Sequence, residues 1–206
     1  MQTKKRIILG SASPRRRELL EQIGISFEVR VSDKEEVYHS LIPEEIVKEL
    51  ALSKAENVAD DLREKQEQVK QISFDKKNNV LLDTIVIGAD TIVVSDGSIL
   101  GKPKDEADAV RMIRSLQGRS HKVYTGVAIL DYDDEGKRKS VVHAVETEVF
   151  VNPMSDEEIR EYAATGEPLD KAGRMVYRGS LQLISNGSTE IIITWSDSRY
   201  LMCIDS

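Results

Sequence analysis

Apolar and polar residues follow two patterns along this chain: short β-branched runs, and longer segments whose apolar positions lie three or four residues apart. Ile7–Leu9 is a short run that predicts a strand. A helix is predicted directly after it, because Ser13 suits the N-cap, Pro14 the first helical position and Gly24 the end. A strand thus leads straight into a helix.

The middle of the chain predicts one long helix between strands. Phe27–Val31 alternates like a strand. Pro43 opens a helical pattern that fades through the charged stretch Asp60–Asn79, and we expect that stretch to end in an exposed loop. The β-branched runs Leu81–Gly88 and Thr91–Val94 predict a buried strand pair or one bent strand, interrupted by the glycine, alanine and aspartate where the runs meet.

The second half of the sequence predicts two hairpins and two helices. Asp96–Gly97 is a hairpin turn, and Asp105–Leu116 is an amphipathic helix closed by a glycine. His121–Asp131 and Ser140–Val151 form a second hairpin, and Ser155–Thr165 is a helix with a capping box. Strands and helices alternate irregularly, so we expect an α/β or α+β sheet with helices packed on it. No internal repeat or transmembrane segment emerges.

Composition favours a globular protein with one local positive site. With 206 residues, 40% of them hydrophobic, the chain is long enough for one well-buried domain or for two lobes that share a cleft. The net charge of −7 argues against general binding to nucleic acid or to an anionic membrane. The apolar run after residues 1–6 is too short for a signal peptide, and the single cysteine, Cys203, suits a reducing cytoplasm. His39, His121 and His143 lack the spacing of zinc ligands, so we expect surface or satisfied histidines.

Three consecutive arginines, Arg15, Arg16 and Arg17, fall in the first turn of the first predicted helix. Positive charge there opposes the helix dipole, unless an anion binds among the free backbone N–H groups of that turn. The guanidinium groups and the helix terminus then address the same phosphates. We interpret this segment as a phosphate pocket, with a solvated basic turn as the alternative.

Other charged residues stand at the ends of predicted elements. Asp90 follows an apolar strand and suits a metal ligand or a general base, and Glu36, Lys54 and Lys102 add one carboxylate and two cations. Each alone is most simply a solvated charge. Together with the arginines they supply what triphosphate cleavage needs: cations for the phosphates, carboxylates for a divalent ion and a base for the attacking water. The Walker A and GxGxxG sequences are absent.

The chain resembles the Maf family of nucleotide pyrophosphatases over residues 7–173. The resemblance rests on these motifs: SASPRRRELL (Ser11–Leu20), DKEE (Asp33–Glu36), LALSKA (Leu50–Ala55), IGADTIV (Ile87–Val93), LGKP (Leu100–Pro103), LQGRSHKVYTGV (Leu116–Val127) and EPLDKAG (Glu167–Gly173). It implies one α/β domain over residues 1–206, with a mixed twisted sheet, flanking helices and two lobes around a deep central cleft, as in inosine triphosphatases. It also implies a homodimer that hydrolyses nucleoside triphosphates to the monophosphate and pyrophosphate with a divalent cation, Mg²⁺ or Mn²⁺.

The same resemblance implies roles for single residues. Asp90, in the ADT triplet, corresponds to the proton acceptor, and Glu36 with Asp90 to the metal ligands. Arg16 and Thr91 correspond to residues that mark the branch acting on dTTP and UTP; the branch that prefers 7-methyl-GTP carries a tryptophan in the first motif, which this chain lacks. Lys171, beside Asp170, belongs to the family's cleft segment. The residues that match its phosphate contacts are Ser11, Arg15, Arg16, Lys54 and Lys102.

Residues 174–206 depart from the family pattern. The family continues with AYGIQG and later with a DYYNVVGLP-like strand and turn, whereas this chain does not. A shifted reading frame lets the codons of Gly173–Gly179 encode AYGIQG and those of Gly187–Tyr200 encode INGDYYNVVGLP. We therefore expect a frameshift near Gly173, which removes the family's base-selecting glutamine and its final strand and helix. The alternative is a divergent tail in which Glu190–Thr194 pairs with the sheet.

Three functions follow as hypotheses. The first is a cytoplasmic pyrophosphatase of dTTP and UTP, with modified pyrimidine nucleotides as further substrates and an activity that the altered tail impairs. The second is a noncatalytic nucleotide-binding regulator of cell division or septum formation. The third is a phosphate-binding α/β domain whose arginines hold an anion. Asp90 and Glu36 favour the enzyme, whereas the altered tail favours loss of activity.

Overall fold

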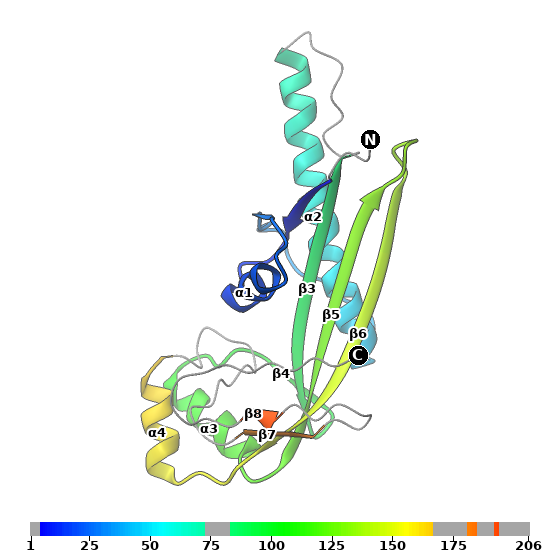
Figure 1. Cartoon of the computed structure of the whole chain (residues 1–206). Coiled ribbons are helices and arrows are strands. Elements are labelled where there is room, and N and C mark those ends of the chain that lie inside the picture. Colours follow the sequence, from blue (N-terminus) through cyan, green and yellow to red (C-terminus); the bar gives the residue numbers. More distant parts are fainter. Residues whose placement is uncertain (1–4, 73–82, 167–180, 185–191, 194–206) are drawn as a thin grey trace. The chain divides into compact units, whose positions relative to one another are not determined.

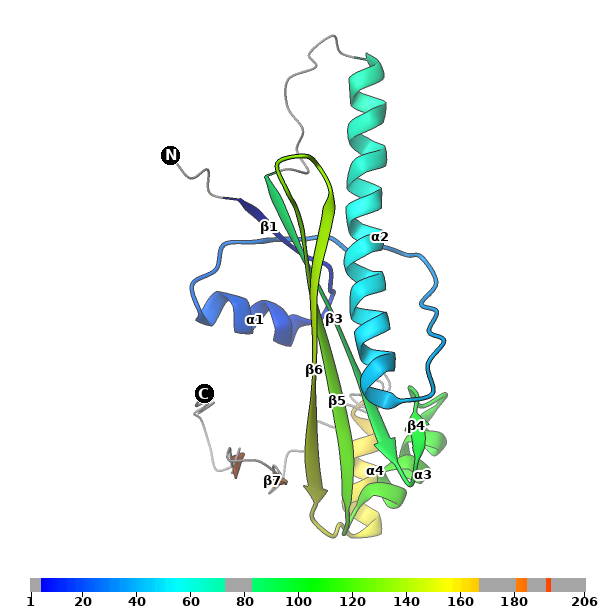
Figure 2. The same cartoon turned by 90° about the vertical axis from the view of Figure 1, so that its right-hand side faces the viewer.

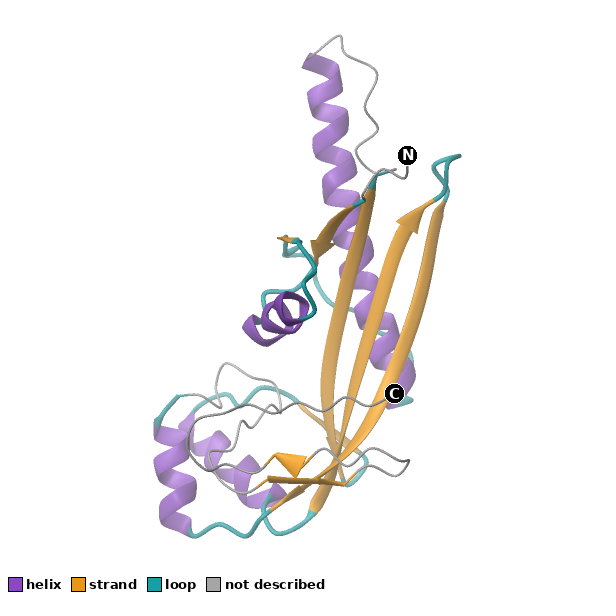
Figure 3. Ribbon diagram, viewed as in Figure 1, coloured by secondary structure: helices purple, strands orange, loops and turns teal. Residues whose placement is uncertain are grey.

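The computed structural model describes residues 5–72, 83–166, 181–184 and 192–193, in which helices flank a mixed sheet (Figures 1 and 3). The helices are α1 (Pro14–Gln22), α2 (Pro43–Ile72), α3 (Glu106–Leu116) and α4 (Asp156–Ala164). The strands are β1 (Arg6–Leu9), β2 (Glu28–Val29), β3 (Thr84–Ser95), β4 (Ser98–Leu100), β5 (Ser120–Tyr132), β6 (Arg138–Val151), β7 (Leu181–Ile184) and β8 (Ile192–Ile193).

The strands join in the order β2-β1-β3-β5-β6-β7-β8, and β4 pairs with β3 off this path. β1 is parallel to β2 and β3, whereas β4 is antiparallel to β3, β7 to β6 and β8 to β7. The fold is therefore the mixed α/β class that the sequence predicts. The chain forms two compact units, a first unit of Met1–Asp90 with Thr125–Ala144 and a second unit of Thr91–Tyr124 with Val145–Ser206. The predicted central cleft stays a prediction.

In the first unit, one face of α2 packs on the sheet. Its residues Ala51, Ala55 and Val58 recur at helical spacing and are buried. They share a core with Val86 of β3 and Leu130 of β5. Figure 2 shows α2 running beside these two strands. The apolar spacing after Pro43 thus decides which face of the helix meets the sheet.

Two glycines let the backbone of α2 come close to the strands. A Cβ atom on Gly88 of β3 would lie 2.2 Å from the carbonyl oxygen of Ala51, and one on Gly126 of β5 would lie 2.1 Å from that of Val47. No side chain fits in such a gap without moving backbone, so glycine sets the distance between helix and sheet at both points.

The helices of the second unit begin as the sequence predicts. Asp105 caps α3, since its Oδ1 accepts a hydrogen bond from the Asp108 backbone N–H at 2.8 Å. Ser155 and Glu158 form the predicted capping box at α4: Ser155 Oγ accepts from the Glu158 N–H, and Glu158 Oε2 accepts from the Ser155 N–H at 2.8 Å. The two helices share one buried cluster.

Two of the predicted boundaries in the first unit are wrong. The strand predicted at Phe27–Val31 shortens to β2, in which Val29 lies opposite Leu9, the last residue of β1. The helical pattern does not fade after Asp60, and α2 continues to Ile72. The charged residues there are good helix formers, and Arg63 pairs with Glu67 one turn on at 3.2 Å. Residues 73–79, where we expect that stretch to end in an exposed loop, lie outside the described residues.

The predicted interruption before Thr91 is also wrong, since β3 runs unbroken through Gly88. The glycine there marks the close approach of α2 and not a break in the strand. Both predicted hairpins are confirmed. Asp96 and Gly97 have φ values of 50° and 74° in the first turn. Asp133 closes the second, where its Oδ1 accepts from the Lys137 N–H at 2.8 Å.

After Gly173 the structure describes only β7 and β8. Ile192 lies opposite Gln182 of β7, so part of the predicted segment Glu190–Thr194 pairs with the sheet, as the divergent-tail alternative expects. Strand pairing requires only residues that favour strands, which Ile192 and Ile193 do whatever their origin. The frameshift therefore stays a prediction.

Of the three histidines, His39 and His143 are exposed, as predicted. His121 in β5 is buried, and its Nδ1 has no hydrogen-bond partner within the described parts of the chain. This corrects the expectation of a satisfied histidine. Burial lowers the pKa of His121 below its usual 6.5, and the positive charge of Arg119 lowers it further.

His121 is expected to make stability fall as the pH drops below about 6.5, the pKa of a histidine in the unfolded chain. Its folded pKa lies below the unfolded value of 6.5, so the unfolded chain binds the proton first as the pH falls. The contribution of His121 to the free energy of unfolding is therefore complete above pH 6.5 and is lost as the pH falls below it. Urea unfolding of the parent and of His121→Gln at several pH values measures this. An equal loss of unfolding free energy in both proteins would contradict the assignment.

Candidate active site

Ser11 and Arg16 join the beginning of α1 to β3. Ser13 occupies the predicted N-cap position, but its side chain makes no capping hydrogen bond. The buried Ser11 instead accepts a hydrogen bond through Oγ from the Ser13 backbone N–H at 3.3 Å. Arg16 donates from one nitrogen to Ser11 Oγ at 2.8 Å and to the Ala89 carbonyl at 3.0 Å. The guanidinium group therefore contacts the residue that precedes Asp90, and both belong to the first unit.

The two other arginines of this turn make different contacts. Arg15 pairs with Glu18 of the same helix at 3.2 Å, and Arg17 donates to the Ala12 carbonyl at 3.1 Å. Arg16 contacts the strand that carries Asp90, through the Ala89 carbonyl. The three arginines are equivalent in the sequence pattern, but they differ in the residues that they contact in the fold.

Lys54, Asp90 and Glu36 form a cluster in the first unit. Lys54 Nζ on α2 lies 2.5 Å from Asp90 Oδ1 on β3 and 3.1 Å from Glu36 Oε1, which stands between β2 and α2. The side chains of Lys54 and Asp90 are 21% and 14% exposed, whereas that of Glu36 is 50% exposed. Asp90 is thus the most shielded of the three and Glu36 the most accessible.

Packing of α2 on β3 places Lys54 beside Asp90. Gly88 precedes Asp90 by two residues, and its missing side chain leaves room for the helix backbone at Ala51 and Ala55. Lys54 stands between these two alanines in the sequence. The contact between ammonium and carboxylate therefore depends on a backbone approach that only glycine permits.

The cluster has the chemistry of an incomplete divalent-metal site. Two carboxylates converge on one ammonium nitrogen, so a cationic position between them already exists. Mg²⁺ commonly takes one or two protein carboxylates and completes its shell with substrate phosphates and water. No group of three or more His, Cys, Asp or Glu side chains gathers in the parts of the chain that are described. Glu36 and Asp90 therefore fit such an ion only if a ligand supplies the other oxygens.

Three predicted site residues remain: Thr91, Lys102 and Lys171. Thr91 follows Asp90 along β3, so the two side chains point to opposite faces of the strand. Lys102 follows β4 and is exposed. Thr91 and Lys102 both belong to the second unit. Lys171 and Asp170 lie outside the described residues. The structure thus brings together Ser11, Arg16, Glu36, Lys54 and Asp90.

Sequence reasoning did not identify two features of the site. One is the carbonyl of Ala89 as a partner of Arg16, which no side-chain pattern announces. The other is Gly88 as the point where α2 approaches β3. A glycine inside a β-branched run is a signal for such an approach, but it also suits the break in the strand that we predicted.

Comparison with known proteins gives one consistent family. The family model described as Maf-like protein matches residues 6–190, and so reaches past Gly173. A dTTP/UTP pyrophosphatase from Agathobacter rectalis is 41% identical over 88% of this chain and 85% of its own length. Proteins of the same name from Dictyoglomus turgidum and Geotalea uraniireducens are 43% and 45% identical, over 88% and 87% of this chain and 83% and 81% of theirs. The solved Ham1 protein of Staphylococcus aureus is 16% identical, with a TM-score of 0.38 over 70% of this chain and 72% of its own.

Proposed function

The chain belongs to the Maf-like protein family, and we propose that it hydrolyses dTTP and UTP to the monophosphate and pyrophosphate. The contact of Lys54 Nζ with both Asp90 and Glu36 carries this proposal, because it joins a base, a cation and a second carboxylate at one point. Relatives at 41% to 45% identity bear the name dTTP/UTP pyrophosphatase. A noncatalytic regulator is not favoured, since it does not need a base, a cation and a second carboxylate at one point.

In the proposed reaction, Asp90 accepts a proton from water as the water oxygen attacks the α-phosphorus. The bond from the α-phosphorus to the bridging oxygen breaks, and pyrophosphate leaves with the bonding electron pair. Lys54 holds the Asp90 carboxylate in place and adds positive charge near the phosphates. Arg16 binds phosphate oxygens from the first turn of α1.

We further propose that Glu36 and Asp90 hold a Mg²⁺ or Mn²⁺ ion together with the triphosphate. When bound, the ion neutralises charge on the phosphate oxygens. Activity should disappear with EDTA and return with Mg²⁺ or Mn²⁺. Glu36→Gln should raise the metal concentration needed for half-maximal activity. Metal-independent turnover of dTTP would contradict this part of the proposal.

The base preference is tested by comparing initial rates with dTTP, UTP, dCTP, dATP and 7-methyl-GTP. We expect dTTP and UTP to be hydrolysed fastest, with Thr91, Lys102 and Lys171 among the residues that contact substrate. A higher rate with 7-methyl-GTP would place the chain in the other branch.

Arg16→Ala should weaken triphosphate binding by roughly tenfold or more, because a hydrogen bond between charged groups is lost. Unlike an exposed arginine, Arg16 also holds Ser11 and Ala89, so we expect a loss of about 1 kcal/mol of stability as well. Thermal shifts with the α,β-methylene analogue of UTP measure both effects. Arg17→Ala is the matched control, since Arg17 donates to the Ala12 carbonyl just before α1. Equal ligand-induced shifts in the parent and both variants would rule out the phosphate contact.

The tail gives a separate prediction. If residues 174–206 are translated out of frame, their apolar side chains were not selected for the surfaces they meet. Shifting the frame back at codon 173 should raise the melting temperature and the rate of dTTP hydrolysis, whereas deleting the tail should raise neither. Equal rates in the parent and the frame-corrected chain, or a gene without a coherent shifted reading, would identify the tail as a real variant.

No helix in the described part of the chain is long and apolar enough to cross a membrane. A cytoplasmic location, a homodimer and the absence of nucleic-acid binding are further parts of the proposal. The net charge of −7 supports the last of these. Light scattering at several protein concentrations tests the dimer.

A further inference from the structure

Glu36 belongs to a segment that contacts α2 through polar groups. The segment, residues 31–39, has no helix or strand. Lys34 Nζ lies 3.0 Å from Asp61 Oδ1, Glu36 lies 3.1 Å from Lys54, and the His39 backbone N–H donates to Glu49 Oε2 at 2.6 Å. Successive contacts meet α2 at positions 61, 54 and 49, so the segment runs antiparallel to the helix.

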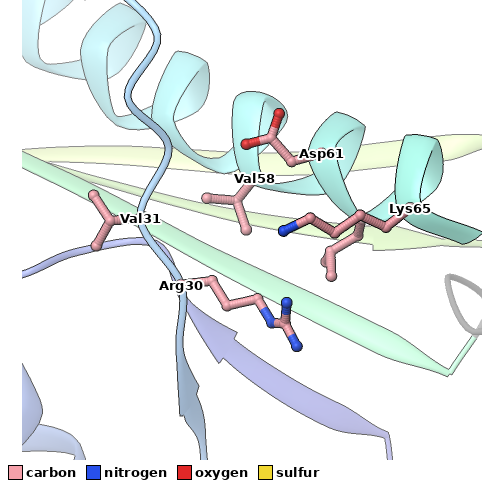
Figure 4. A pocket seen from close by; sticks show the side chains of 6 residues that line it. Arg30, Val31, Val58, Asp61 and Lys65 are labelled. Atoms are coloured by element: carbon pink, nitrogen blue, oxygen red, sulfur yellow. The ribbon is translucent and has the colours of Figure 1, made fainter.

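Apolar packing contributes little to holding this segment. Its residues Val31, Val37 and Tyr38 are 53%, 53% and 46% exposed. A pocket of about 150 Å³ separates Arg30 and Val31 from α2 at Val58 and Asp61, and Figure 4 shows the chain passing the helix across this gap. Polar contacts therefore determine where the segment lies.

Asp61 anchors the side of the segment that leads to Glu36. It pairs with Lys34 and also accepts a hydrogen bond from the Ser32 side chain. Burial acts to raise the pKa of Asp61, but the hydrogen bonds from Lys34 and Ser32 and the charges of Lys34 and Lys65 outweigh it, and the pKa is lowered. The hydrogen bond to Asp61 raises the pKa of Lys34. Both groups are thus charged at neutral pH.

We propose that the Lys34–Asp61 ion pair is a positioning device that holds Glu36 at Lys54 and Asp90 and thereby tunes the affinity of the site for its divalent cation. Lys34 and Asp61 act through Glu36 and touch no reacting atom. The proposal rests on the proposed function, since it takes Glu36 as a metal ligand. Asp61 and Lys54 lie two turns apart on one face of α2, so the helix fixes the spacing between the anchor and the site.

The test measures the Mg²⁺ concentration for half-maximal pyrophosphate release by the full chain. Lys34→Gln and Asp61→Asn should each raise it about twofold to fivefold, the range set by the strength of exposed ion pairs, with kcat at saturating Mg²⁺ unchanged. The double variant should add nothing to the larger single effect. Lys48→Gln is the matched control, because Lys48 pairs within α2, with Glu44 and Glu45.

A Glu36→Gln background separates positioning from a general effect of charge. In that background Lys34→Gln should no longer change the Mg²⁺ requirement. An effect of the same size there, no effect of Lys34→Gln in the parent, or an equal effect of Lys48→Gln would each overturn the proposal. If Glu36→Gln itself leaves the Mg²⁺ requirement unchanged, the metal assignment of the proposed function fails instead.

Hydrogen–deuterium exchange provides a second measurement that needs no activity. Peptides covering residues 31–39 should take up deuterium faster in Lys34→Gln and Asp61→Asn than in the parent, and Lys48→Gln should match the parent. Unchanged exchange in the first two variants would show that the ion pair does not hold the segment, whether or not the chain hydrolyses nucleotides.

Discussion

Asp90→Asn is expected to lower pyrophosphate release from dTTP by about 10²- to 10⁴-fold, the usual contribution of a general base. Asparagine keeps the shape of the side chain and an oxygen that can still accept a hydrogen bond from Lys54. It cannot accept the proton of the attacking water. Substrate binding should therefore survive much better than turnover.

Steady-state kinetics of the frame-corrected chain at saturating Mg²⁺ measures this effect, and the α,β-methylene analogue of UTP measures binding separately. Asp96→Asn is the matched control, because Asp96 lies in the β3–β4 turn and pairs with Arg119. Near-parental turnover by Asp90→Asn would exclude Asp90 as the base. Equal losses in both variants would indicate a nonspecific effect of charge.

Gly88→Ala should lower both the free energy of unfolding and kcat/KM, because it moves α2 away from β3. Its Cβ would lie 2.2 Å from Ala51 O and 2.7 Å from Ala55 N, so the backbone of α2 must move away from β3. Overpacking of this kind costs about 1–3 kcal/mol. Because Lys54 stands between the two alanines, it should also separate from Asp90, and a shift of about 1 Å can lower kcat/KM by roughly 10²-fold.

Urea unfolding and kcat/KM for dTTP measure the two effects of Gly88→Ala. Gly101→Ala is the control for stability, since a Cβ there meets no atom of the described residues within 4 Å. A Gly88→Ala variant with parental unfolding free energy would show that α2 does not approach β3 so closely. A destabilised variant with parental kcat/KM would show that the packing at Gly88 does not position Lys54.

The sequence allows most of the local structure to be predicted because its signals are local. Pro14 at the beginning of α1, the turn at Asp96–Gly97 and the capping box of Ser155 all act within a few residues. The predictions fail where a contact with a distant part of the chain determines where a strand begins, ends or continues. β2 ends at Val29 because β1 ends opposite it, and β3 continues through Gly88 because a helix packs there.

The candidate site divides in the same way. Asp90, Lys54 and Glu36 can be selected from residue type and motif, and the fold does bring them together. Their arrangement could not be predicted, because Lys54 reaches Asp90 across 36 residues of sequence. Nor could the special position of Arg16 among three arginines, which depends on a backbone carbonyl. The Lys34–Asp61 pair could not be predicted either, since each residue alone is most simply a solvated surface charge.

The most direct test of the central claim identifies the products that the chain makes from dTTP in the presence of Mg²⁺. Phosphorus NMR distinguishes cleavage between the α- and β-phosphates from cleavage between β and γ. We expect dTMP and pyrophosphate in equal amounts from the frame-corrected chain, and almost none from its Asp90→Asn variant. Formation of dTDP and inorganic phosphate, or no turnover by the frame-corrected chain, would contradict it.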